Sequence, residues 1–166
     1  MNKEPFWEPS KKIIQDSNIY KMMQQFGCGS YQDFWKWSIH NKTSFWEKTV
    51  QNLEINLASN YSKFLDVSDG NENAKWLKNA TLNIVDSCFQ NNDDSIAIRY
   101  QENGNPINDV SQEDLQILVN KISNGLLELG LSSCDKIAID MPMTLEAVAI
   151  YLASIKAGMP VVTIAD

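Results

Sequence analysis

The sequence contains few of the side chains that bind metal ions or form disulfides. Its 166 residues include three cysteines and one histidine. Cys28, Cys88 and Cys134 form no Cys-X-X-Cys pair. An odd, scattered set of this kind is typical of reduced intracellular thiols rather than of a disulfide framework. Because His40 is the only histidine and no ligand spacing recurs, we expect no zinc site.

Long apolar segments are also missing. No stretch approaches the roughly 20 apolar residues that a membrane-spanning helix needs. The opening segment Met1–Trp7 lacks the apolar core of a secretion signal. The sequence therefore predicts an intracellular protein without a transmembrane segment.

Positive charge is scarce in most of the chain, whose net charge is −7. Residues 1–60 carry seven basic and six acidic side chains, a net charge of +1. Residues 61–166 carry seven basic and 15 acidic side chains, a net charge of −8. Since a nucleic-acid groove needs a basic face, we expect no nucleic-acid partner and interpret the acidic side chains as a solvated surface.

The usual constellations of catalytic side chains do not occur. His40 is predicted near the last carbonyls of a helix, where a histidine is favourable without being a base or a ligand. The acidic pairs Asp93–Asp94 and Glu113–Asp114 are typical of a loop and of a helix cap. Asp140, on a predicted buried strand, could face a sheet edge or pair with a basic residue, and we favour a structural role.

No phosphate-binding loop is recognisable either. Phe26–Ser30 is followed by no Gly-Lys-Ser or Gly-Lys-Thr, and the pattern Gly-X-Gly-X-X-Gly is absent. We therefore predict no catalytic, cofactor-binding or metal-binding residue in this chain.

The clearest pattern is a strand, a helix and a second strand near the end of the chain. Apolar Ile137–Met141 has strand length and ends at Pro142, which has no N–H for a sheet. Thr144 is a natural N-cap for a helix over Leu145–Lys156.

Gly158 suits the left-handed residue that ends this helix, and Pro160 prevents the helix from resuming. Val161–Ile164 is short and mostly β-branched, as a second strand would be. Strands joined in this way form a parallel βαβ unit with a right-handed crossover. Ligands bind beyond the carboxyl ends of such strands, and this strand is expected to end with the chain at Asp166.

Residues 95–130 predict a hairpin and a long helix. Ser95–Tyr100 alternates as a strand does, Asn-Gly within Glu102–Asn105 favours a type I′ turn, and Pro106–Val110 pairs back. Ser111–Asp114 has the spacing of a capping box. The apolar stripe of the following helix comprises Leu115, Leu118, Ile122, Leu126 and Leu129.

The first half of the chain predicts short helices and an irregular segment. Ser30–Asp33 resembles a capping box, Thr43 is expected to cap a second helix, and at most one short helix is expected before residue 30. Aromatic side chains gather at helical spacing, and one face is expected to hold Tyr31, Phe34, Trp35 and Ser38. Such a cluster could be a ligand platform, but it more often fixes a helical arm to a larger body.

Residues 54–80 predict an irregular, extended arm. It contains a turn at Asp69–Asn73, with Trp76 and Leu77 as its anchors. Asn83–Phe89 predicts one or two helical turns, and one side is expected to hold Leu82, Val85 and Phe89.

Taken together, these patterns predict an α/β fold. A helical N-terminal arm occupies residues 1–94. The first βαβ part of an incomplete parallel sheet occupies residues 95–166.

The segment Leu126–Val148 resembles the start of the adenylate-forming (AMP-forming) acyl-CoA synthetase fold. In that family a long helix ends in Leu-Gly, and Gly-Asp precedes a strand. Met-Pro-Met or Leu-Pro-Asn then leads into a Glu-Ala-Val helix that ends in Ala-Gly. This chain follows the pattern but has Cys134 where the family usually has glycine before Asp135.

The earlier part is similar to the N-terminal region of acetyl-CoA synthetases. Tyr31–His40 followed by Ser44–Trp46 resembles the Trp-Ser…Phe-Trp arm of that region. Ala74–Asn83 resembles its Trp-Phe-Pro-Gly-Gly-Lys-Leu-Asn segment, with Lys78 and Asn79 in place of Pro-Gly.

Ile139–Thr144 with Val162–Asp166 is most similar to the plant acyl-activating enzymes related to acetyl-CoA synthetase. The resemblance implies an acetate/acyl-CoA ligase that converts a carboxylate, ATP and CoA to acyl-CoA, AMP and pyrophosphate, with Mg²⁺ on the phosphates. Residues 1–94 would be the acetyl-CoA synthetase-like arm, and residues 95–166 the truncated start of the AMP-binding domain.

The same resemblance implies that the phosphate loop, the adenine- and ribose-binding motifs and the lid lysine follow Asp166. We therefore expect this chain alone to be inactive and to bind no ATP, CoA or Mg²⁺. Small-molecule substrates would belong to the full-length enzyme.

Two hypotheses for the function stay open. The first is the N-terminal portion of a ligase that lacks the catalytic motifs, and the alternative is a non-catalytic truncated protein that acts as a partner-binding module. An unfinished sheet also predicts possible self-association. The expected compartment is the cytoplasm or the peroxisome, and no targeting signal is visible in this chain.

Overall fold

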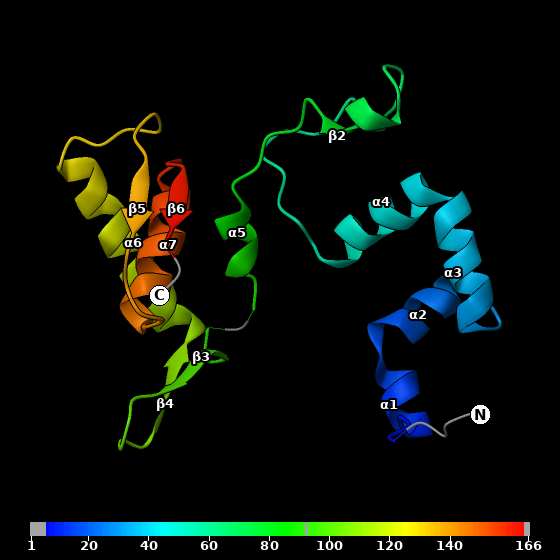
Figure 1. The fold of residues 1–166 in the computed structure, drawn as a ribbon, viewed down its shortest axis with the longest axis horizontal. Helices are drawn as coiled ribbons and strands as arrows, with labels where there is room; N and C mark the ends of the chain where they lie inside the picture. Colours follow the sequence, from blue (N-terminus) through cyan, green and yellow to red (C-terminus); the bar gives the residue numbers. More distant parts are fainter. Residues whose placement is uncertain (1–5, 92, 165–166) are drawn as a thin grey trace. The chain divides into compact units, whose positions relative to one another are not determined.

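A computed structural model describes residues 6–91 and 93–164 of the chain (Figure 1). The chain divides into two compact units, Met1–Leu53 and Glu54–Asp166. Asn92 of the predicted loop, the first five residues and Asp166 of the predicted second strand lie outside the described residues. The division into an arm over residues 1–94 and a domain start over residues 95–166 stays a prediction.

The first unit is helical. Its helices are α1 (Lys11–Asp16), α2 (Asn18–Gln25), α3 (Tyr31–His40) and α4 (Lys42–Asn52). α1, α2 and α3 begin after serines whose hydroxyl oxygens accept a backbone N–H, namely Ser10, Ser17 and Ser30. Because Ser10 and Ser17 both act as caps, two helices precede residue 30, and the prediction of at most one was wrong.

Ser30 caps α3, and Asp33 is its partner, as the predicted spacing requires. The hydroxyl oxygen of Ser30 accepts the N–H of Asp33 at 3.1 Å, and the hydroxyl donates to the Asp33 carboxylate at 2.6 Å. The prediction that Thr43 caps the next helix was wrong, since α4 begins at Lys42 and its N-cap is Asn41. The Asn41 side chain donates to the Trp37 carbonyl at 3.0 Å. Asn41 is therefore both the last cap of α3 and the first cap of α4.

Aromatic rings form the interior of the first unit. Phe34 is buried, and its ring centroid lies 6.5 Å from that of Phe26, 6.1 Å from Trp37 and 5.9 Å from Phe45. Tyr31 and Trp35, expected on the same face of the helix as Phe34, are exposed, so Phe34 is the buried residue of that set. Phe34 and Trp37 make the inward stripe, at the helical spacing of three residues.

The second unit begins with a hairpin that the sequence did not predict. β1 (Lys63–Asp66) pairs antiparallel with β2 (Lys75–Lys78), and a 3₁₀ turn, η1 (Asn71–Asn73), lies between them. The predicted turn is confirmed, and Gly70 at its start has φ +94°. Both strands mix lysines with large apolar residues without a regular alternation, so their sequence gave a weak strand signal.

The next part contains α5 (Ile84–Cys88), the antiparallel strands β3 (Ile96–Gln101) and β4 (Ile107–Ser111), and α6 (Gln112–Glu128). The predicted hairpin is confirmed, but its turn is not of type I′. Of the two central residues, Gly104 has a positive φ, +80°, and Asn103 does not, as in a type II turn. The strands therefore pair across a longer loop, with Gln101 opposite Ile107.

The predicted strand-helix-strand unit is confirmed. β5 (Ile137–Ile139) and β6 (Val161–Thr163) are parallel, and α7 (Leu145–Lys156) has the predicted bounds. Thr144 caps α7 by accepting the N–H of Ala147. Gly158, with φ +81°, ends α7 in a Schellman motif, in which Met159 donates to Ser154 and Gly158 to Ile155.

The apolar core of the second unit lies between α5, α6 and α7. Its buried residues are Val85, Leu115, Val119, Ala149 and Ala153. The stripe predicted for α6 is correct at Leu115, and Leu118 and Ile122 pack against the core. Leu129 was wrongly included, because it lies beyond the packed part of the helix and is 79% exposed. Leu82, predicted beside Val85 and Phe89, is also exposed.

One asparagine side chain connects two helix ends in this unit. Asn83 accepts the N–H of Val85 at the start of α5. Its amide nitrogen donates to the carbonyls of Ile155 and Lys156, at 3.0 and 3.1 Å, at the end of α7. These carbonyls belong to the last turn of α7, where the regular partner four residues further along the helix is missing, and that of Ile155 also accepts the N–H of Gly158. Asn83 therefore fixes α5 against α7.

The described residues form three separate two-stranded sheets: β1–β2, β3–β4 and β5–β6. The architecture is α/β, as predicted, with helices first and a short parallel sheet last (Figure 1). No helix within residues 6–91 and 93–164 is long and apolar enough to span a membrane.

Candidate functional site

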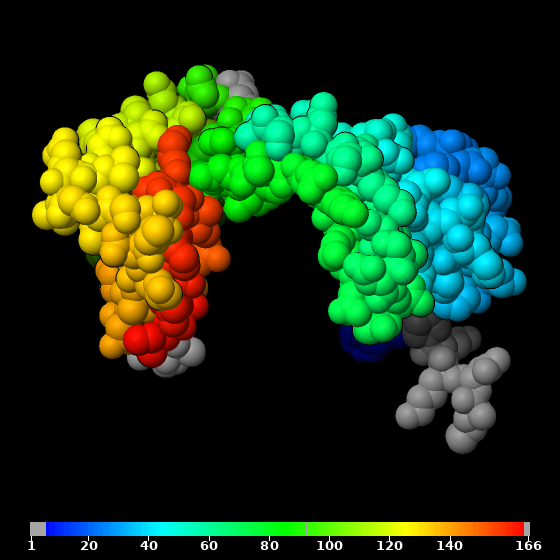
Figure 2. Space-filling view, turned by 90° about the horizontal axis from the view of Figure 1, so that it is seen from above, coloured from blue at the N-terminus to red at the C-terminus, as the bar shows by residue number. Residues whose placement is uncertain are grey.

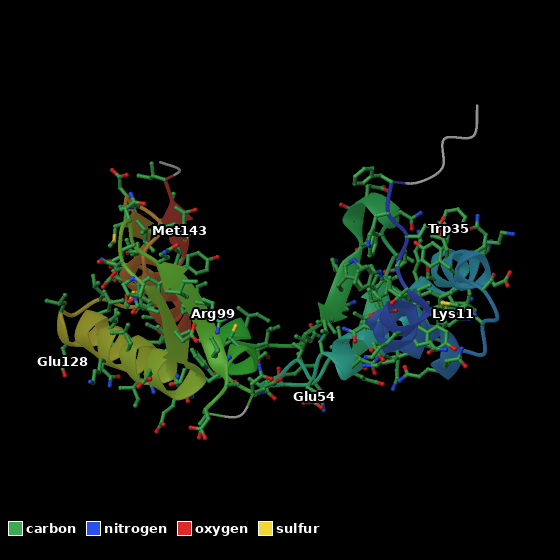
Figure 3. All side chains as sticks on the ribbon, turned by 90° about the horizontal axis from the view of Figure 1, so that it is seen from below. Lys11, Trp35, Glu54, Arg99, Glu128 and Met143 are labelled. Carbon is green, nitrogen blue, oxygen red and sulfur yellow. The ribbon has the colours of Figure 1, made fainter. Side chains whose placement is uncertain are left out.

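An open hollow lies at the carboxyl ends of the parallel strands, where sheets of this kind bind ligands. It has a volume of about 620 Å³. We call it the β5–β6 groove, and its lining consists of Ile139, Met141, Pro142, Met143, Ala147, Val148, Tyr151, Thr163 and Ile164. Figure 3 labels Met143 beside the end of this sheet.

The turn between β5 and α7 shapes one wall of the groove. Pro142 has no N–H for a sheet ladder, and its carbonyl accepts the N–H of Thr144 at 2.8 Å. This tight bend starts α7 directly after the strand. Met143, at the tip of the bend, is 90% exposed. This wall therefore includes the apolar side chain of Met143, which the turn exposes to solvent.

The chemistry of the groove is that of an apolar surface. None of its lining side chains is charged, and only the hydroxyls of Tyr151 and Thr163 are polar. A nucleotide polyphosphate requires cationic side chains or a nest of N–H groups. The lining thus does not fit the phosphates of ATP, and it contains no carboxylate, histidine, lysine or cysteine.

Asp140 does not lie where the sequence predicted. β5 ends at Ile139, and Asp140 is exposed just beyond it rather than on a buried strand. The prediction was wrong because Pro142 and the bend after it shorten the strand. Asp140 is also outside the set of residues that line the groove.

The other candidate residues of the sequence have structural roles. The Nδ1 atom of His40 lies 2.7 Å from the carbonyl of Lys36, so His40 is a helix-end residue as predicted. The hydroxyl of Ser111 donates to Asp114 at 2.7 Å and accepts its N–H, which confirms the cap of α6. Asp93 is exposed, and its carbonyl accepts the N–H of Glu113.

The most buried charged group was missed by the sequence analysis. Asp66 in β1 is 5% exposed, and its carboxylate accepts hydrogen bonds from Lys78 at 2.6 Å and Lys63 at 2.9 Å. These bonds, with others from Ser68, hold the pKa of Asp66 well below its usual range. The cluster joins β1 to β2. No sequence signal singled it out, because the partners meet only after the hairpin forms.

A second ion pair strengthens the other hairpin. Arg99 in β3 donates to both carboxylate oxygens of Asp109 in β4, at 2.6 and 2.8 Å. This pairing lowers the pKa of Asp109 and raises that of Arg99. In both clusters the charged groups pair with one another, and each cluster links the two strands of its hairpin.

Metal binding finds no support in the arrangement of side chains. In the part of the chain that the structure describes, no three His, Cys, Asp or Glu side chains are grouped closely enough to hold an ion. The Mg²⁺ of the family that the sequence resembles has no fitting ligand set among these residues.

Two family models match adjoining parts of the chain. The model described as "Acetyl-coenzyme A synthetase N-terminus" matches residues 31–88, and the model described as "AMP-binding enzyme" matches residues 85–166. Together they extend from Tyr31, the first residue of α3, to residue 166.

Curated relatives match three quarters or more of the chain. Probable acyl-activating enzyme 17, peroxisomal, of Arabidopsis thaliana is 32% identical over 98% of this chain and 25% of its own length. Acetyl-coenzyme A synthetase of Salmonella typhi is 31% identical over 77% of this chain and 20% of its own length. The chain thus spans a quarter or less of the length of these relatives.

A solved structure confirms the fold. Acetoacetyl-CoA synthetase from Streptomyces lividans superposes on 98% of this chain with a TM-score of 0.87, at 21% sequence identity. The match takes up 26% of that chain. At this identity the similarity establishes the architecture alone.

Proposed function

This chain belongs to the family of AMP-forming acyl- and acetyl-CoA synthetases and matches their N-terminal region; from that premise we propose that it forms the N-terminal part of an acetate- or acyl-CoA ligase. The ligase reaction has two steps. A carboxylate oxygen attacks the α-phosphorus of ATP and displaces pyrophosphate. The CoA thiol, on losing its proton, then displaces AMP from the acyl-adenylate to form the thioester.

In this proposal the chain contributes framework rather than reacting groups. The single observation that carries it is the continuous family match over residues 31–166. The apolar, uncharged lining of the β5–β6 groove supports the further proposal that the groups acting on ATP, CoA and Mg²⁺ lie in other parts of the ligase. The substrates are small carboxylates, and no nucleic acid is involved, in keeping with the net charge of −7.

Exchange of labelled pyrophosphate into ATP tests this proposal. We expect the purified chain to show no acetate- or hexanoate-dependent exchange. We expect exchange to appear when the chain is fused to the remaining length of acyl-activating enzyme 17. Exchange by the isolated chain, or a well-folded fusion that is inactive toward a panel of carboxylates, would contradict the proposal.

A second candidate function is favoured by the open groove. A non-catalytic protein that uses this region to bind a partner would keep the fold of residues 54–166 without any chemistry. A stable monomer that unfolds cooperatively supports such an independent module. Soluble aggregates formed by the purified chain would instead support a region that depends on the rest of a ligase.

We further propose an intracellular location, in the cytoplasm or the peroxisome. Two of the plant relatives, acyl-activating enzymes 17 and 18, carry the word peroxisomal in their names. Fluorescent tagging of the complete gene product in its own cells would distinguish the two compartments.

A further inference from the structure

We propose that Asn103, in the loop between β3 and β4, is a modification site at which the chain spontaneously deamidates to aspartate and isoaspartate. The isoaspartyl product is a substrate for the class of methyltransferase that esterifies isoaspartyl carboxylates with S-adenosylmethionine. The chain contains a second Asn-Gly step, Asn124-Gly125, and its helix protects it from the same reaction. Neither site depends on the proposed ligase activity.

The reaction needs an asparagine whose following backbone nitrogen is accessible. The nitrogen of Gly104 loses its proton and forms a bond to the side-chain carbonyl carbon of Asn103. The bond from that carbon to its amide nitrogen breaks, and ammonia leaves with the proton. Water then opens the cyclic imide at the side-chain carbon, which gives aspartate, or at the main-chain carbon, which gives isoaspartate. The net change is loss of ammonia and gain of water, so no cofactor is required.

The turn at residues 102–105 presents Asn103 in the required way. It is closed by a hydrogen bond from the N–H of Asn105 to the carbonyl of Glu102 at 3.0 Å, so the N–H of Gly104 is not its donor. A Cβ built on Gly104 would meet no atom within 4 Å, which leaves its nitrogen open to approach. All four residues are exposed, and the loop projects away from α6 and α7 (Figure 1). Within the described residues, no hydrogen bond holds the Asn103 side chain, whereas that of Asn105 donates to Glu102 at 3.2 Å.

Two related steps in the second unit each lack one requirement. Asn105, in the same loop, is followed by Pro106, whose nitrogen carries no hydrogen to lose. Asp69 is followed by a glycine, but the N–H of Gly70 donates to the carbonyl of Val67 at 3.1 Å. The reaction is therefore expected at Asn103 before either of these positions.

The second Asn-Gly step shows that exposure of the side chain does not decide reactivity. Asn124 is exposed on α6, and Figure 2 shows the yellow residues of this helix at the surface. Gly125 lies inside α6, where the regular helical bond joins its N–H to the carbonyl of Lys121. The helix must open locally to release this nitrogen, and such opening costs free energy. The two sites thus differ in their backbone rather than in their side chains.

Conversion of Asn103 changes the hairpin in two ways. It places a carboxylate beside Glu102, which adds a repulsion between like charges. Isoaspartate also lengthens the backbone of a turn that sets Gln101 opposite Ile107. We therefore expect faster hydrogen exchange in β3 and β4 of the aged chain, while α7 keeps its protection.

Ageing of the purified chain at mildly alkaline pH, followed by trypsin digestion and mass spectrometry, tests the assignment. Trypsin separates the two Asn-Gly steps into the peptides Tyr100–Lys121 and Ile122–Lys136. We expect a gain of about 1 Da at Asn103, where a hydroxyl group replaces an amino group. Conversion of Asn124 should be slower by about tenfold or more, because α6 must first open. In urea, where neither the turn nor the helix persists, the two rates should become similar.

Methyl transfer from labelled S-adenosylmethionine by an isoaspartyl methyltransferase gives a second readout. The aged wild-type chain should take up label. Asn103→Gln should lose most of it, because the longer side chain forms its ring far more slowly, and the matched control Asn124→Gln should keep it. Equal conversion of both sites in the folded chain, or labelling that Asn103→Gln leaves unchanged, would overturn the site. A difference in rate that persists in urea would overturn the protective role of α6.

Discussion

The two units of this chain are stabilised in different ways. Residues 54–166 have a core of aliphatic side chains between three helices, with Val85, Val119, Ala149 and Ala153 fully buried. In the described part of residues 1–53, two hydrophobic side chains, Met23 and Phe34, are buried, and stacked aromatic rings provide most of the interior. The comparison indicates that the second unit is held by close packing and the first by a few large rings.

The largest expected effect is on the aliphatic core. Leu115→Ala removes a 5%-exposed side chain on α6 and should destabilise the second unit by about 4 kcal/mol, because a cavity remains between well-packed helices. Ile117→Ala is the control on the same helix, where the side chain is 43% exposed. It should cost less than about 1 kcal/mol. Urea denaturation measures both, and equal losses would contradict the assignment of the core.

The aromatic interior of the first unit should respond separately. Phe34→Ala removes the ring that neighbours Phe26, Trp37 and Phe45, and should cost about 3 kcal/mol. Trp35→Ala, at an exposed position one residue away, is the control and should cost much less. Tryptophan fluorescence and hydrogen exchange would show loss of α2–α4 while α6 and α7 stay protected. Concerted loss of α6 and α7 would show that the units do not unfold independently.

A glycine pair compares a helix end with a helix interior. Gly158→Ala puts a side chain at φ +81°, with its Cβ 3.4 Å from that of Ser133, and should destabilise by about 1–2 kcal/mol. Gly125→Ala, inside α6 where no atom lies within 4 Å of the new Cβ, should stabilise by about 0.5–1 kcal/mol. Thermal denaturation measures the two changes. Opposite signs are expected, and matching signs would contradict the Schellman end of α7.

The smallest effect is expected at the β1–β2 hairpin and depends on pH. Because folding lowers the pKa of Asp66 from its usual value of 3.8, its contribution is present above about pH 4 and is lost as the pH falls further. The partners Lys78 and Lys63 are 40% and 57% exposed, so solvent weakens the pairs. Asp66→Asn should remove part of the acid sensitivity between pH 4 and pH 2. Identical acid titrations of variant and wild type, followed by NMR signals of the hairpin, would contradict this role.

Local chemistry explains which elements the sequence predicted. α7 was predicted to the residue because Thr144 begins it and Gly158 ends it, and each acts through atoms within a few positions along the chain. The Asn-Gly hairpin was predicted for the same reason. Its turn type was predicted wrongly, because the pairing of β3 with β4 decides how many residues the loop contains.

Elements that depend on distant partners were not predicted. β1 and β2 are four residues each and depend on one another and on Asp66, which contacts Lys78 twelve residues away. For the groove, the sequence predicted only the position of a binding site, at the carboxyl end of a parallel sheet. Its volume and lack of charge arise from Met143, Tyr151 and Ile164, which meet only in the folded chain.

The asparagine that connects α5 to α7 sets an order of events during synthesis. Asn83 and Lys156 are 73 residues apart, and at about 5–20 residues per second the ribosome needs about 4–15 s to make the intervening chain. α5 has five residues, too few to persist as an isolated helix. The segment around Asn83 therefore leaves the ribosome before its partner exists, and it remains available to chaperones until α7 has formed.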